Sequence, residues 1–231
     1  PRPPPPPTEI YTRVGSSAAS DVYKRQARRV QYSDLMVGTL YITGDPAADG
    51  LLNTDPNALL LGMLLDQQVP MEWAFAGPAT LRERLGHLDP ARIAAMDEDD
   101  FVSVCCEKPA IHRFPASMGR RIHQVCAALV ADYDGTALNL WIDVDSGTAL
   151  LRRLKALPGF GDEKSKIFVA ILGKTQGVTP DGWRAAAGKF GDDVPRSVAD
   201  VTDEASLEKV RAWKKAQKAA KKDKQDRPLA S

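Results

Sequence analysis

The sequence predicts an all-α protein, and three features support that fold class. Apolar residues recur at helical spacing through most of the chain after Asp55, whereas only residues 38–44 read as a short extended segment. A turn with two glycines at 157–161 separates two of the helical segments. The hydrophobic share of 43% and the charged share of 26% are ordinary for a folded protein, and 231 residues suffice for one globular unit or two small ones.

The first 26 residues differ in character from the rest of the chain. Residues 1–7 are nearly all proline, and residues 7–26 have neither helical nor strand periodicity. This stretch resembles a translated sequencing-library adapter, so we exclude it from the fold prediction. The alternative is a disordered, proline-rich natural tail; a signal peptide is not favoured, because the stretch has no apolar core.

The three cysteines, Cys105, Cys106 and Cys126, match neither a zinc-site spacing nor a disulfide framework. We interpret them as reduced, mostly buried thiols of a cytoplasmic protein. The chain has no run of eighteen apolar residues, so no membrane-spanning segment is expected.

The first clear helix is expected to begin near Asp55 and to end before Pro70. It is apolar almost all round, which predicts that it is buried. Further helices are predicted over residues 72–85, 89–96, 97–106 and 116–133. The acidic first turn of the 97–106 segment suits a helix N-terminus, and this interpretation is favoured over a metal site.

The central feature is the turn Leu157-Pro158-Gly159-Phe160-Gly161, which lies between two predicted helices. Proline and glycine end the first helix, and the second begins at Asp162 or Glu163 and continues through Leu172. The free backbone N–H groups at the start of the second helix are expected to attract an anion such as a phosphate. The alternative is a plain turn between two helices that needs glycine for its geometry.

Two more helices are expected towards the C-terminus. The first runs from Asp181 to about Phe190, and a long one covers residues 203–224. Beyond Trp213 the long helix is rich in lysine and has no apolar face, which predicts that its end frays. This lysine-rich end either binds DNA phosphates non-specifically or is a solvated tail.

The glycine turn resembles the Leu-Pro-Gly-hydrophobic-Gly hairpin of the helix-hairpin-helix (HhH-GPD) base-excision DNA glycosylases, the superfamily that includes endonuclease III. The site of the nucleophilic lysine in lyase-competent members falls on Glu163. Eighteen residues further on, at the spacing of the superfamily's catalytic Asp, the chain has Asp181. The resemblance therefore implies that Asp181 is catalytic. The alternative, a helix N-cap, is compatible with that role.

A second pattern carries the same resemblance. These glycosylases have a Leu-x-x-Gln at the end of an early helix, and the glutamine enters the minor groove beside the extruded nucleotide. Leu65-Asp66-Gln67-Gln68 matches and places Gln68 at that position; the alternative is a pair of polar residues at a helix end. The hairpin amides, with Lys164 and Lys166 nearby, would hold a backbone phosphate.

The resemblance covers about residues 55–195 and implies two helical lobes with a central cleft. Two departures matter. Iron–sulfur members place four cysteines after the catalytic region, but no cysteine follows Cys126, so no such cluster is expected. Glu163 replaces the nucleophilic lysine, and Lys164 is a poor substitute because adjacent helical residues point about 100° apart. No cofactor is expected, with a monovalent cation at the hairpin as the one candidate.

The expected function is hydrolysis of the N-glycosidic bond of a damaged or mismatched base in double-stranded DNA, without strand cleavage. The alternatives are a non-catalytic DNA-binding module and a helical interaction protein. The glycosylase domain is expected over residues 27–213, followed by a basic tail at 214–231. We expect a monomer associated with the nucleoid in the cytoplasm.

Overall fold

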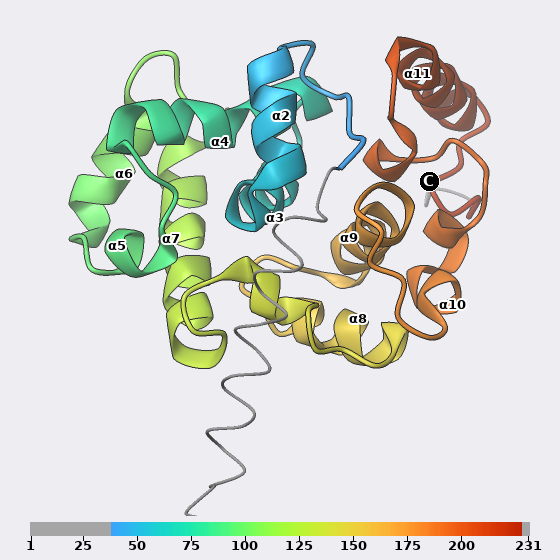
Figure 1. The fold of residues 1–231 in the computed structure, drawn as a ribbon. Helices are drawn as coiled ribbons and strands as arrows, with labels where there is room; N and C mark the ends of the chain where they lie inside the picture. The colour runs from blue at the N-terminus through green and yellow to red at the C-terminus, as the bar shows by residue number, and fades with distance from the viewer. Residues whose placement is uncertain (1–37, 228–231) are drawn as a thin grey trace, which may run out of the picture.

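The computed structural model describes residues 38–227 (Figure 1). The predictions for residues 1–26, and for 27–37 and 228–231, lie outside this range. Within it the chain forms ten α-helices and three short 3-10 helices. The described residues contain no β-strand, and their single β-type contact is an isolated bridge between Ser146 and Asp181. The all-α prediction is confirmed.

One lobe is built from the helices between residues 71 and 132. These are α4 (Met71–Leu85), α5 (Pro90–Ala94), α6 (Glu98–Cys106) and α7 (Pro115–Asp132). Figure 1 shows α5 and α6 against α7 on the left, with α4 above them. Asp89 and Asp97 start α5 and α6 by accepting backbone N–H groups, so both helices begin where the acidic N-cap residues predict.

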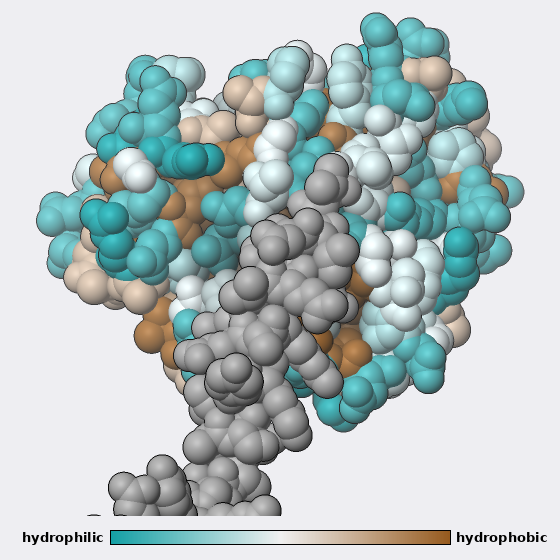
Figure 2. Space-filling view, viewed as in Figure 1, coloured by the Kyte–Doolittle hydropathy of each residue, from teal (hydrophilic) through white to brown (hydrophobic). Residues whose placement is uncertain are grey.

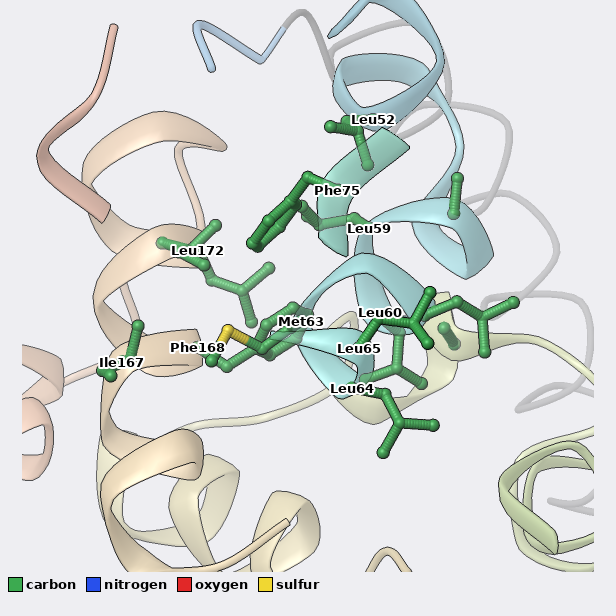
Figure 3. Close-up of a cluster of buried hydrophobic side chains, with 14 of the residues drawn as sticks. Leu52, Leu59, Leu60, Met63, Leu64, Leu65, Phe75, Ile167, Phe168 and Leu172 are labelled. Atoms are coloured by element: carbon green, nitrogen blue, oxygen red, sulfur yellow. The ribbon is translucent and has the colours of Figure 1, made fainter. Parts of the chain in front are cut away.

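Helix α3 (Pro56–Leu65) is the buried centre of the molecule. Every residue from Ala58 to Leu65 is buried, as its all-round apolar sequence predicts. Figure 3 shows Met63 of α3 pointing towards Phe168 of the other lobe, and Leu59 lies beside Phe75 of α4. The two lobes therefore share one core, which passes through α3.

The other lobe contains the helical elements from residue 137 onwards. They are η1 (Ala137–Leu140), α8 (Gly147–Lys155), α9 (Asp162–Thr175), α10 (Trp183–Ala187), η2 (Gly188–Gly191), η3 (Val198–Asp200) and α11 (Glu204–Ala219). Helix α9 lies at the centre, packed against α8, α10 and η3. Phe168 on α9 meets the rings of Trp141 and Phe160 edge-on, with centroids 5.9 and 6.0 Å away.

Two parts of the chain differ from the sequence prediction. A helix that was not predicted, α2 (Pro46–Thr54), precedes α3 and is capped by Asp45. The last helix ends at Ala219, not near residue 224, and the following turn folds back on the domain. Asp226 in this turn binds the guanidinium of Arg196, so the segment is held by ion pairing where no apolar face exists.

The surface seen in Figure 2 is mostly hydrophilic at its outer edges, while hydrophobic side chains gather in a recess over α4, α6 and α7. Between residues 38 and 227, no helix has the length and apolar character needed to cross a membrane.

Candidate nucleic-acid interface

The glycine turn forms the predicted helical hairpin between α8 and α9. Gly159 has a φ of +80°, and a Cβ there would lie 2.3 Å from the side chain of Arg121, so both conformation and space require glycine. Gly161 differs, because it has an ordinary φ of −75° and a Cβ on it would meet nothing within 4 Å. Gly161 therefore faces open space at the start of α9.

The first turn of α9 has no side-chain cap on Gly161. Backbone N–H groups at an uncapped helix start suit an anion, and the phosphate contact itself stays a prediction. Lys155 and Lys166 lie beside this turn and bind the carboxylate of Asp162 at 3.0 and 2.8 Å. The hydrogen bond from Lys166, followed by that from Lys155, lowers the pKa of Asp162. The two lysines thus offset the acidic residue at the hairpin.

A pocket of about 370 Å³ adjoins the hairpin, between the C-terminal end of α3 and the N-terminal end of α9. Its polar lining consists of Asp66, Gln67, Asp162, Glu163, Lys164 and Lys224. Because α3 and α9 meet where the two lobes join, this pocket occupies the cleft that the predicted two-lobed fold requires.

Lys164 extends under the end of α3. Its ammonium group donates a hydrogen bond to the carbonyl of Leu64 at 2.6 Å and lies 5.9 Å from the centre of the Phe160 ring. Burial lowers the pKa of Lys164 to about 8, and the positive charge of Arg121 acts in the same direction, while Asp66 opposes it. Lys164 is therefore an amine that loses its proton unusually easily.

Glu163 also lines the pocket, but it binds a different part of the chain. Its carboxylate accepts a hydrogen bond from the Gln225 amide at 3.4 Å and lies 3.7 Å from the Lys224 ammonium. Neighbouring residues of α9 thus contact opposite sides of the pocket, since Lys164 binds α3 and Glu163 binds the C-terminal turn.

The loop between α3 and α4 presents the two adjacent glutamines differently. The Gln67 side chain lines the pocket and accepts a hydrogen bond from Arg121 at 3.1 Å. Gln68 is exposed, with a φ of +59° that is uncommon for a residue other than glycine. His112 Nε2 donates to the Gln67 carbonyl while Nδ1 accepts from Phe114 N–H, so His112 fixes the loop as a neutral imidazole.

Asp181 lies away from this pocket. Its backbone N–H donates to the Asp145 carbonyl at 3.2 Å, and its carbonyl accepts from Gly147 N–H at 2.8 Å, which attaches it to the start of α8. The hairpin follows the other end of that nine-residue helix, about 13 Å further along its axis. Gly182 is the N-cap of α10, so the N-cap role considered for Asp181 is wrong.

The structure brings the hairpin, Lys164 and Gln67 together, with Gln68 on the exposed side of the same loop, and it leaves Asp181 elsewhere. The chain reaches Asp181 only after passing the far end of α9, where the Trp183 ring covers Gly173 so closely that a Cβ there would lie 2.4 Å from it. The side chain of Asp181 is exposed, and its catalytic role stays a prediction.

Sequence reasoning missed Asp66 and Lys224 as pocket residues. Asp66 lies within the Leu-x-x-Gln pattern, next to Gln67, so the pattern could have indicated it as a site residue. Lys224 had no such signal, because its position depends on how the C-terminal turn folds back.

Burial raises the pKa of the Cys105 and Cys126 thiols to about 12, which makes both unreactive.

Comparison with known protein families agrees with this geometry. The family described as HhH-GPD superfamily base excision DNA repair protein matches residues 61–227, which is more than half of the chain. No curated protein matches the sequence. The chain belongs to the HhH-GPD superfamily of base excision DNA repair proteins, and DNA is the substrate class of that family.

Proposed function

We propose that this HhH-GPD protein is a DNA glycosylase that hydrolyses the N-glycosidic bond of a damaged or mismatched base, acting as a monomer on double-stranded DNA. The observation that carries the proposal is the pocket where the lobes join, because it places carboxylates and a buried amine beside an uncapped hairpin helix. A hairpin that holds the DNA backbone would bring one nucleotide to the mouth of this pocket.

The reaction requires the target nucleotide to leave the base stack, because its glycosidic bond is inaccessible within a duplex. Gln68 is the residue proposed to enter the gap, and its exposure at the loop tip supports that role. A glutamine side chain both donates and accepts hydrogen bonds, so it replaces the groups that the lost base pair leaves open.

As the glycosidic bond breaks, positive charge develops on the sugar, and a nearby carboxylate stabilises that charge and orients a water molecule. The sequence pattern assigns this role to Asp181. Pocket geometry favours Asp66, which lines the cavity and lies close enough to Lys164 to influence its pKa. The two assignments are competing hypotheses and predict opposite results for matched variants.

We propose that the enzyme is monofunctional. Glu163 stands at the position of the nucleophilic lysine and cannot form a Schiff base. The nearby amine of Lys164 is hydrogen-bonded to Leu64 under α3, which supports a positioning role within the pocket wall. Water is then the nucleophile, and the strand stays intact after base release.

We further propose that the enzyme has no iron–sulfur cluster, because its three cysteines cannot supply the usual four thiolate ligands. The three cysteines lie in the lobe formed by α4 to α7, away from the hairpin. A monovalent cation bound by hairpin carbonyls remains the one candidate cofactor.

The test is a set of labelled duplexes, each carrying one damaged or mismatched base, incubated with the full chain and analysed for released base. Release from at least one duplex, with an intact strand before alkali treatment, is the expected result. Binding that depends on salt without any base release would support the non-catalytic DNA-binding module instead. Absence of both would leave the helical interaction protein.

A further inference from the structure

Helix α11 and the turn that follows it enclose a second pocket of about 370 Å³ beside the first one. Four lysines line it: Lys214 and Lys218 on α11, and Lys222 and Lys224 in the turn. We call this pocket the lysine groove. It shares Glu163 and Lys224 with the pocket beside the hairpin, so the two cavities adjoin.

The lysine groove has fewer acidic residues than lysines in its lining, so its net charge is positive. Glu163 lies 3.7 Å from Lys224, and Asp223 binds Arg227 at 2.6 Å. Both carboxylates are thus engaged, and Lys214, Lys218 and Lys222 have no ion-pair partner among residues 38–227. An excess of positive charge in a recess attracts an anion.

Lys214 is the decisive residue, because its ammonium group is half-buried yet not paired with a carboxylate. Within the described part of the chain, this ammonium group donates a hydrogen bond to the sulfur of Met71 at 3.7 Å, and a thioether sulfur is a weak acceptor. Burial lowers the pKa of Lys214, and the charge of Lys224 lowers it further, while the carboxylates of Asp66, Glu72 and Asp200, beyond ion-pair distance, oppose the shift. A partly desolvated charge without a counter-ion is costly, and a bound anion would remove that cost.

The wall of the lysine groove is held in place by contacts outside it. Trp213 stacks on the guanidinium of Arg196, with 5.1 Å from the guanidinium carbon to the ring centre. Arg196 in turn binds Asp226 and Asp192. The turn carrying Lys222 and Lys224 is therefore fixed against α11, and the groove is a preformed site.

We propose that the lysine groove binds a phosphate group of the DNA backbone, with Lys214 as its buried contact and Lys218, Lys222 and Lys224 around it. This proposal rests on the proposed DNA glycosylase function, since the groove would hold the strand next to the nucleotide in the hairpin pocket. Lysine suits this role because a compact ammonium binds a phosphate as a point charge. A free phosphate or a mononucleotide has the same chemistry and is distinguished by experiment.

The experiment measures binding of the full chain to fluorescein-labelled duplexes in which single phosphates are replaced by uncharged methylphosphonates. Lys214→Met removes the charge and keeps the shape. We expect about a tenfold loss of affinity and a salt dependence reduced by about one phosphate contact. One methylphosphonate position should weaken the wild type and leave Lys214→Met unchanged. Lys215→Met, on the exposed neighbouring residue, is the matched control.

If no methylphosphonate position couples to Lys214, the groove does not bind the backbone. Should Lys214→Met fail to fold, the exposed Lys222→Gln replaces it in the same scan. Inorganic phosphate and a nucleoside monophosphate are titrated separately. If either of them binds tightly and Lys214→Met loses that binding, while no methylphosphonate position couples to Lys214, the groove binds a free phosphate or nucleotide. That result would overturn the proposal that its ligand is the DNA backbone. The lesion panel is read independently, so coupling without base release would refute the glycosylase function and leave the groove intact.

Discussion

Lys164 on α9 and Leu64 on α3 are joined by a hydrogen bond of 2.6 Å between the lysine ammonium and the leucine carbonyl. The Leu64 carbonyl belongs to the last turn of α3, whose carbonyls lack a partner within the helix. The bond therefore satisfies a helix end and connects the two lobes at the pocket. It also places a charged group where burial disfavours it, which has a measurable effect on stability.

The buried charge of Lys164 predicts a pH-dependent gain from its removal. Its pKa falls from 10.5 to about 8 on folding, so between those values the folded protein has released a proton that the unfolded chain still holds. Stability from this group consequently rises with pH across that window, and the penalty is complete below pH 8. Lys164→Met removes this penalty but leaves the Leu64 carbonyl without its partner, so its stability relative to the wild type should be higher at pH 7 than at pH 10 by up to about 3 kcal/mol.

Urea unfolding at pH 7 and pH 10 tests this expectation, with exposed Lys215→Met as the control for general effects of pH. The advantage of Lys164→Met should shrink at pH 10. An advantage that stays constant would mean that the amine does not lose its proton in this range.

Binding of DNA at the hairpin predicts that Gly161→Asp weakens the complex. Gly161 has open space around it, so the variant should fold, but it places a negative charge where a phosphate is expected. Anisotropy with a labelled duplex should show a loss of about tenfold or more at moderate salt. Gly50→Asp, on an equally open glycine of α2, carries the same charge change and should bind normally.

The competing carboxylate hypotheses are separated by Asp66→Asn and Asp181→Asn. Both substitutions keep the side-chain shape and remove the charge and the basicity. If pocket geometry decides, Asp66→Asn should lower base release about 10²- to 10⁴-fold while binding persists, and Asp181→Asn should remain active. The reverse outcome would establish the sequence-based assignment to Asp181. Full activity in both variants would exclude each of them as the catalytic carboxylate.

Monofunctional chemistry predicts that borohydride does not trap a covalent complex with lesion DNA, because Glu163 cannot form an imine. Denaturing gel electrophoresis of the reduced mixture provides the measurement. A trapped band that disappears in Lys164→Ala would identify Lys164 as a nucleophile and contradict the proposal. A band that persists in Lys164→Ala would point to another amine.

The contact between Asp226 and Arg196 predicts that the C-terminal turn contributes to stability. The side chain of Arg196 is only 5% exposed, and Asp226 binds it at 2.5 Å. Asp226→Asn should destabilise the fold by about 1–2 kcal/mol in urea unfolding, because Asp192 still partly compensates the guanidinium. Asp223→Asn keeps an Oδ1 atom for the N–H groups of Gln225 and Arg227 and loses only the charge pair with the exposed Arg227, so it should cause no measurable change. Wild-type stability in Asp226→Asn would show that the C-terminal turn does not contribute to stability.

Much of the fold could be predicted because its signals are local. Asp89 and Asp97 begin helices where short acidic residues precede helical apolar spacing, and the all-round apolar sequence of α3 correctly indicated burial. Helix α2 was missed although Asp45 and Pro46 give it the same start signal that Asp89 and Pro90 give α5. The end of α11 was misplaced because lysine and alanine favour a helix locally, whereas the ion pair with Arg196 requires a turn.

The sequence by itself determined the helical class, the glycine hairpin and the superfamily, since these depend on neighbouring residues and on residue type. Gly159 illustrates the point, because its φ of +80° is a property of the turn itself. Only the tertiary structure decided which charged groups share a pocket. Asp181 lies at the expected count from Glu163 but at the other end of α8, while Asp66 and Lys224, distant in sequence, meet beside Lys164. The number of residues between two positions fixes only the length of chain between them. The distance between their side chains depends on how the connecting loops fold.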